Sequence, residues 1–209
     1  MRIALFFLFF SWTSLGAQKY TIKFNIKDSI KRVFKDECAQ SNFSGVLLVA
    51  KEGKPICYLS NGYRDFEKKS ALRKTDIFEL ASVSKQFTAM IIMMLQERGK
   101  LGLDDHLNKW IKDLPFEGIS IRHMLTHTSG LPDYQAIMDA HWDKSKVADN
   151  IDVIEYLKKY PEPLHFKPGT KYEYSNTGYL LLASIAEAAS DVNFIQLMRN
   201  WVFNPAKMK

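Results

Sequence analysis

Hydrophobic positions recur at helical spacing through most of this chain, with one interruption near its start. In residues 26–39 the apolar side chains fall three or four positions apart, which predicts a helix with one apolar face. The next apolar run, residues 46–50, is separated from residues 55–59 by a polar turn that contains Gly53. Two such runs around a glycine-containing turn predict a β-hairpin.

A polar stretch at residues 61–75 is expected to form a loop, and beyond it the pattern becomes helical. Helices, or one or two short helical turns in the second case, are predicted at residues 82–98, 103–114, 119–127, 152–160, 176–190 and 193–203. The order of helix, hairpin and many helices predicts a mixed α/β (α+β) fold. An isolated hairpin needs more strands or a helix against it, and no later segment offers a convincing strand.

The composition is that of a folded globular protein. The chain has 209 residues, of which 46% are hydrophobic and 25% are charged, which argues against long disordered regions. The net charge of +6 comes from scattered lysine pairs rather than from a basic block. Because no nucleic-acid motif accompanies this charge, we expect no nucleic-acid partner.

The N-terminus has the pattern of a secretory signal peptide. Arg2 is followed by the apolar run 3–10, and the small residues Gly16 and Ala17 stand at its exit. The run is too short for a bilayer, which needs about 20 apolar residues; an N-terminal membrane anchor is the alternative. We therefore expect residues 1–17 to be removed on export to the periplasm or medium, with no stable membrane anchor after signal cleavage.

Export would place Cys38 and Cys57 in an oxidising compartment, where a disulfide is allowed. The sequence alone leaves open whether the two cysteines come within bonding distance. Neither cysteine has a metal-ligand spacing with histidine, and the sequence predicts no metal and no cofactor.

The first candidate for chemistry is Ser82, where a polar loop meets an apolar helix. Its hydroxyl would lie at the positive end of the helix dipole, which stabilises developing negative charge. Lys85 follows three residues later on the same side of the helix and could accept the proton of the serine. The alternative is that Ser82 only caps the helix.

The second candidate is the pair Tyr174 and Asn176, on a loop that enters the helix predicted at 176–190. A tyrosine whose pKa is lowered by a nearby cation can shuttle protons, and an asparagine amide can orient a substrate carbonyl. The alternative is that Asn176 caps this helix and Tyr174 packs against its neighbours.

Together the two clusters resemble a known family. Segment 82–85 (Ser-Val-Ser-Lys) and segment 174–176 (Tyr-Ser-Asn) are similar to the first two motifs of β-lactamases and penicillin-binding proteins. A Tyr-x-Asn second motif resembles the class C β-lactamase branch, with its related D,D-peptidases and esterases. Segment 121–132, which contains Leu-Thr-His-Thr-Ser-Gly-Leu-Pro, and the turn at 166–169 are also similar to that branch. The resemblance runs from about residue 43 to the end of the chain.

The resemblance implies a β-lactamase/transpeptidase-like fold and a role for each candidate residue. Ser82 would be the acylated nucleophile, Lys85 its base partner and Tyr174 the proton relay, while Asn176 would contact the substrate amide. The substrate would be a β-lactam, a D-Ala-D-Ala-type peptide or a small ester, and no cofactor would be needed. His123 and His127, four residues apart, would be structural rather than a Ser-His pair or metal ligands.

The third family motif, Lys-Thr-Gly or His-x-Gly on a strand, should follow Tyr174 at a distance. No glycine occurs after Gly178, so residues 179–209 cannot contain it. We therefore expect residues 18–209 to be an incomplete family domain: the N-terminal helix, hairpin and helical lobe without the C-terminal strands. In the family, the strand with this motif supplies one of the two N–H groups of the oxyanion hole, and loss of one such donor typically costs about 10²–10³ in rate. The alternative is therefore a truncated, non-catalytic penicillin-binding or sensing-like module. The oligomeric state stays open.

Overall fold

The computed structural model describes residues 25–208, so the predicted signal peptide at 1–17 lies outside the described residues. The chain divides after Phe78 into two compact units. Within the described range no single helix is long and apolar enough to cross a membrane. The segments Asn176–Ser190 and Phe194–Phe203 reach that length and composition only as a pair, with an 80° bend between them.

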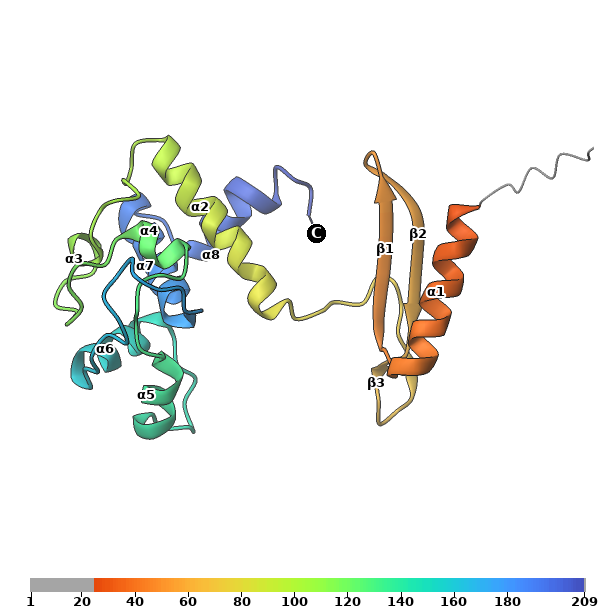
Figure 1. Cartoon of the computed structure of the whole chain (residues 1–209), viewed down its shortest axis with the longest axis horizontal. Helices are drawn as coiled ribbons and strands as arrows, with labels where there is room; N and C mark the ends of the chain where they lie inside the picture. Colours follow the sequence, from red (N-terminus) through yellow and green to blue (C-terminus); the bar gives the residue numbers. More distant parts are fainter. Residues whose placement is uncertain (1–24, 209) are drawn as a thin grey trace, which may run out of the picture. The chain divides into compact units, whose positions relative to one another are not determined.

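The first unit consists of a helix and a hairpin, as predicted. Helix α1 (Ile26–Ser41) lies along the antiparallel strands β1 (Gly45–Lys51) and β2 (Lys54–Asn61) (Figure 1). The strands pair from Gly45 opposite Asn61 to Lys51 opposite Lys54, with a bulge after Val49. The tight turn is possible because Glu52 and Gly53 both adopt positive φ, at 51° and 73°.

The segment at residues 61–75, predicted to be a loop, contains two further short strands. Strand β3 (Tyr63–Asp65) pairs with β4 (Ser70–Ala71) as a separate two-stranded sheet. The prediction was wrong here because strands of three and two residues are too short to show alternating hydrophobicity.

The two cysteines of this unit are unpaired. Cys57 lies on β2 and is buried, whereas Cys38 lies on α1 and is half-buried. The disulfide that the sequence left open is therefore absent from the structure.

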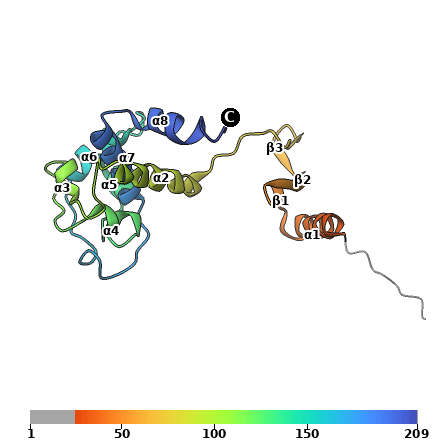
Figure 2. The ribbon, with the colours of Figure 1, turned by 90° about the horizontal axis from the view of Figure 1, so that it is seen from above.

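The second unit is helical, apart from one isolated bridge between His106 and Ser120. Its elements are η1 (Ala81–Ser84), α2 (Lys85–Glu97), α3 (Leu107–Trp110), α4 (Ile121–Leu125), α5 (Tyr134–His141), α6 (Asn150–Lys159), α7 (Asn176–Ser190), α8 (Phe194–Leu197) and η2 (Met198–Phe203). Helices α2 and α7 lie side by side (Figures 1 and 2). Helix α7 also contacts α3, α4, α6 and α8, so it is the central helix of this unit.

The core of the second unit lies between α2 and α7. Ile91 and Leu95 on α2 and Leu181 and Ile185 on α7 are fully buried. Burial of such side chains contributes about 1.5–3 kcal/mol each relative to exposure, before losses of entropy. This packing fixes the two helices whose N-terminal ends carry the candidate residues.

Helix α7 has the predicted bounds, but other helices differ from the prediction. Helix α5 was not predicted. It begins after Asp133, whose side chain accepts from the N–H of Gln135. The segment 119–127 is helical only over Ile121–Leu125. The helix predicted at 193–203 changes to a wider π-helical turn at Met198.

Candidate active site

Ser82 lies in a 3-10 turn that leads into α2, rather than in the first turn of an α-helix. In such a turn, residues three positions apart lie one above the other, which brings Lys85 over Ser82. Ala81 just before it has φ +44°, a left-handed conformation that costs energy for a residue with a Cβ. The Ser84 hydroxyl donates to the Ala81 carbonyl at 2.6 Å and holds this turn. Strained backbone beside an exposed serine is typical of functional sites.

The four predicted site residues lie together in the second unit. The Ser82 Oγ is 2.5 Å from the Tyr174 hydroxyl. The Lys85 Nζ donates to Ser82 Oγ at 3.1 Å and to Asn176 Oδ1 at 2.9 Å. Lys85 therefore links the two motifs, one at the start of α2 and the other at the start of α7.

Lys85 also determines the electrostatics of the site. Its Nζ lies 5.0 Å from the ring centroid of Tyr174 and 5.7 Å from that of Tyr179. The Lys85 ammonium, and then the hydrogen bond with Ser82, lower the pKa of the Tyr174 phenol below its usual 10.0. By contrast, burial and the nearby Tyr174 raise the pKa of Tyr179. The more acidic of the two phenols is the one that contacts the serine.

The site is open to solvent on one side. Ser82 is exposed, the Tyr174 residue is 47% exposed, and Lys85 and Asn176 are half-buried. A substrate can therefore reach the serine hydroxyl without displacing any helix.

Two loops are joined to each other beneath Tyr174 by backbone hydrogen bonds. The N–H groups of His165, Gly169 and Glu173 donate to the carbonyls of Gly130, Thr128 and His127 respectively, each at 2.8 Å. The segment 165–175 is thereby fixed against the segment 127–130, although it contains no helix or strand.

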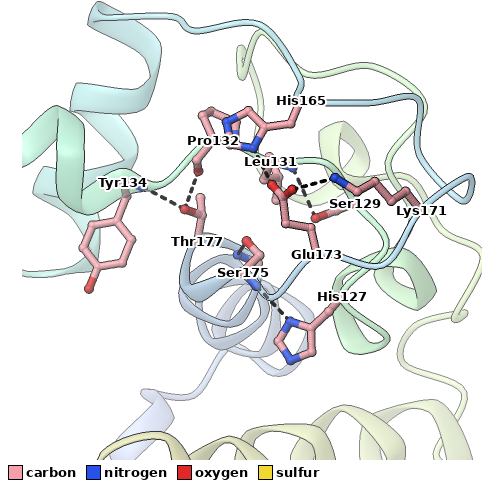
Figure 3. A network of polar contacts seen from close by, with 11 residues as sticks. His127, Ser129, Leu131, Pro132, Tyr134, His165, Lys171, Glu173, Ser175 and Thr177 are labelled. Atoms are coloured by element: carbon pink, nitrogen blue, oxygen red, sulfur yellow. Dashed lines mark hydrogen bonds and ion pairs between the residues drawn. The ribbon is translucent and has the colours of Figure 1, made fainter.

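Buried hydroxyls extend this attachment to the start of α7 (Figure 3). Thr177 is completely buried; its Oγ1 donates to the Pro132 carbonyl at 2.6 Å and accepts from the Tyr134 N–H at 2.9 Å. Ser175 caps α7, since its Oγ accepts from the Gly178 N–H at 3.1 Å. The Thr177 hydroxyl and the Ser175 cap together fix the N-terminus of α7, and with it Asn176.

A cluster of three polar side chains lies on the surface of the same loop. Figure 3 shows the Glu173 carboxylate beside the side chains of His165 and Lys171. The carboxylate is 2.5 Å from His165 Nδ1 and 3.1 Å from Lys171 Nζ. His165 first, and Lys171 second, lower the pKa of Glu173 below its ordinary range.

His127 contacts the ring of Tyr174 and the backbone next to it. Its ring stacks on the Tyr174 ring, with centroids 4.6 Å apart and an interplanar angle of 27°. Its Nδ1 accepts from the Ser175 N–H at 3.1 Å (Figure 3). The family resemblance implied a structural role for His127 and did not indicate these contacts. His123, four residues earlier, instead accepts from the Ser120 N–H and completes the capping box of α4, whose N-cap is Ser120.

Among the residues that the structure describes, no group of three histidine, cysteine, aspartate or glutamate side chains could hold a metal ion.

Comparison with known proteins gives one family for this arrangement. A family profile described as Beta-lactamase matches residues 30–209. Among curated proteins, penicillin-binding protein 4* of Bacillus subtilis (strain 168) is 38% identical over 187 residues, which cover 90% of this chain and 42% of that protein. The chain thus spans less than half the length of this relative.

Solved structures give the same result. The penicillin-binding protein from Bacillus halodurans is 31% identical with a TM-score of 0.71, over 88% of this chain and 54% of that one. The D-amino acid amidase from Ochrobactrum anthropi SV3, complexed with L-phenylalanine, is 27% identical with a TM-score of 0.76, over 88% and 51%.

Proposed function

This chain belongs to the beta-lactamase family, with the β-lactamase/transpeptidase-like fold that the sequence predicted, and from this premise we propose that it is a serine hydrolase that forms an acyl-enzyme on Ser82. The observation that carries the proposal is the position of the Ser82 hydroxyl, between the Lys85 ammonium and the Tyr174 phenol.

The proposed reaction uses these groups in sequence. The Ser82 Oγ attacks the acyl carbonyl of the substrate and loses its proton to the Tyr174 phenolate; Lys85 supports this base as the cation that stabilises the phenolate. Tyr174 then gives the proton to the leaving nitrogen or oxygen, and the carbonyl bond to that atom breaks. A water molecule then attacks the resulting ester and gives its proton to Tyr174. The ester bond to Ser82 Oγ breaks, the acid product leaves, and the proton passes from Tyr174 to Ser82 Oγ.

Asn176 is oriented to contact the substrate. An ammonium group only donates hydrogen bonds, so the oxygen of the Asn176 amide must face Lys85. Its NH₂ group makes no hydrogen bond to any residue in the range 25–208, and it is available for a substrate carbonyl. This supports the predicted contact between Asn176 and the substrate amide.

The substrate is proposed as a class: a β-lactam, a D-Ala-D-Ala-type peptide or a small ester. Two relatives are named for penicillin binding and one for amidase action on D-amino acids, which supports small amide and peptide substrates. Export to the periplasm or medium is proposed on the N-terminal pattern alone. N-terminal sequencing of the protein recovered outside the cytoplasm, beginning near residue 18, would support it.

The test is the intact mass of the protein after incubation with a penicillin and, separately, with an activated ester. We expect one acyl adduct that is absent in Ser82→Ala and present in Ser145→Ala, a matched change at an exposed serine between α5 and α6. A folded wild-type protein that forms no adduct with any acyl donor would contradict the proposal.

The second candidate is the non-catalytic penicillin-binding or sensing-like module. It is supported by the two relatives that are named for penicillin binding. The decay of the adduct separates the two candidates: hydrolysis with repeated turnover supports the enzyme, and an adduct that persists supports the module.

A further inference from the structure

One residue holds the peptide groups on both sides of Tyr174. The His127 carbonyl accepts from the N–H of Glu173 at 2.8 Å, and its Nδ1 accepts from the N–H of Ser175 at 3.1 Å. The ring of the same residue stacks on the Tyr174 ring. The backbone before and after Tyr174 and one face of its side chain are therefore all in contact with His127.

We propose that His127 is the positioning residue for Tyr174 and that it acts as a neutral imidazole with its proton on Nε2. This rests on the proposed function, in which Tyr174 relays protons for Ser82. The tautomer follows from the contact: Nδ1 accepts a hydrogen bond from Ser175, so it cannot itself carry a proton.

The surroundings of His127 support the neutral form. The charged and titratable groups that face its ring are the Lys85 ammonium and the phenols of Tyr172, Tyr174 and Tyr179. Burial first, and then Lys85, lower the pKa of His127 below 6.5. Since the acceptor exists only above that pKa, the bond to Ser175 survives to a lower pH than an ordinary histidine would allow.

His127 is placed to position rather than to react. No hydrogen bond joins its ring to Ser82 within the described part of the chain; its Nδ1 bonds to Ser175. It has a φ of +56°, in the left-handed region that asparagine tolerates better than most residues. In asparagine, the Oδ1 atom is as many bonds from the backbone as the histidine Nδ1.

Two variants separate the acceptor from the ring. His127→Asn keeps an acceptor for Ser175 that does not titrate, and His127→Phe keeps the stacking ring without an acceptor. His123→Asn is the matched control. In the wild type, His123 Nδ1 likewise accepts a backbone N–H, that of Ser120, in the capping box of α4. Two readouts are measured for each: the rate of acylation by an activated ester between pH 4 and pH 8, and hydrogen–deuterium exchange at the Ser175 amide.

We expect His127→Phe to exchange the Ser175 amide faster and to acylate more slowly, by on the order of 10²-fold, the effect of misplacing a catalytic group by about 1 Å. His127→Asn should retain most of the rate and the protection of Ser175, as should His123→Asn. In the wild type, protection of Ser175 should be lost at acid pH as His127 protonates, and in His127→Asn it should persist. The wild-type and His127→Asn comparison holds even if His127→Phe does not fold.

A Ser175 amide whose exchange has the same pH dependence in wild type and His127→Asn would overturn the proposal. So would a His127→Asn variant that keeps Ser175 protected and still loses as much acylation as His127→Phe. If the wild type forms no adduct while the exchange results are as expected, the proposed hydrolase function fails and the attachment of the Tyr174 loop by His127 is supported.

Discussion

Ser82 Oγ lies 2.5 Å from the hydroxyl of Tyr174, although the two residues are 92 positions apart in the sequence. Lys85 donates a second hydrogen bond to the same serine oxygen at 3.1 Å. The Lys85 ammonium has no lone pair and cannot accept a proton. Tyr174 is therefore the acceptor that a proton leaving Ser82 can reach directly. The hydrogen bond between Ser82 and Tyr174 thus connects the 3-10 turn before α2 with the loop before α7.

Replacing Tyr174 by phenylalanine should remove this acceptor and leave the ring in place. We expect the rate of acylation by an activated ester to fall about 10²–10⁴-fold, the usual contribution of a positioned acid–base group. The matched control is Tyr172→Phe, whose lost hydroxyl makes no hydrogen bond to residues 25–208. Equal rates for Tyr174→Phe and the control would contradict the relay role.

Lys85→Met should raise the pKa of Tyr174 back towards 10.0, because the Lys85 ammonium is the main cause of its lowering. A phenolate exists only above the pKa, so tyrosinate absorbance from Tyr174 should begin at higher pH in the variant. The absorbance of Tyr174 is the difference between a protein with Tyr174 and the same protein with Tyr174→Phe. This difference is measured once in the wild-type background and once in the Lys85→Met background. Lys109→Met, which removes an ammonium paired with Asp105, should leave this titration unchanged.

Thr177→Val keeps the shape of a fully buried side chain and removes its hydroxyl. The Pro132 carbonyl and the Tyr134 N–H then lose their partner, at a cost of about 1–3 kcal/mol in unfolding free energy for each unsatisfied group. Thr177→Ser keeps both hydrogen bonds and loses one methyl group, which costs about 1 kcal/mol. Urea denaturation should therefore place Val below Ser in stability, and the reverse order would disprove this role of the hydroxyl.

Glu173→Gln should change the pH dependence of stability. The pKa of the Glu173 carboxyl is lowered in the folded protein from its ordinary 4.5, by His165 first and then Lys171. A lowered pKa means that the carboxylate stabilises the fold above pH 4.5 and loses this effect as the pH falls through the folded value. The difference in urea midpoint between wild type and variant should be present at neutral pH and vanish in acid.

Salt provides a further check on Glu173, because exposed ion pairs are screened. The same difference should shrink at high ionic strength. The control is Glu162→Gln, which removes a carboxylate that forms no ion pair with residues 25–208. A pH-dependent difference of equal size in that variant would show that net charge, not the contacts of Glu173, is responsible.

The elements that the sequence predicted well have strong local signals. Helix α7 begins at Asn176 and ends at Ser190 as predicted, because a long apolar segment follows the polar residues of the loop before it. Helix α5 was missed because only eight residues form it, after Asp133, in a segment for which no element was predicted. The 3-10 turn at Ser82 was missed because its hydrogen bonds depend on the conformation of Ala81, which composition does not reveal.

The candidate site was predictable in its residues and only partly in its geometry. The spacing of Ser82 and Lys85 predicts their proximity by itself, whereas their contact with Tyr174 and Asn176 followed from the family resemblance. No local pattern could have predicted that the ring of His127 binds the Ser175 amide, 48 positions later. The available signal was a histidine in a segment rich in serine, threonine and glycine, typical of a bent loop.

The loops behind Tyr174 are joined through peptide groups, and this determines which substitutions they can tolerate. Every residue except proline supplies both a carbonyl and an N–H, so at His165 and Glu173 many side chains satisfy the same bonds and proline alone removes a donor. Gly130 is different, because its φ is +72° and an added Cβ would collide with the Phe166 carbonyl oxygen. Divergent sequences could therefore vary widely along these loops and still hold the tyrosine in place, provided that His127 and Gly130 are kept and no proline occurs at the donor positions.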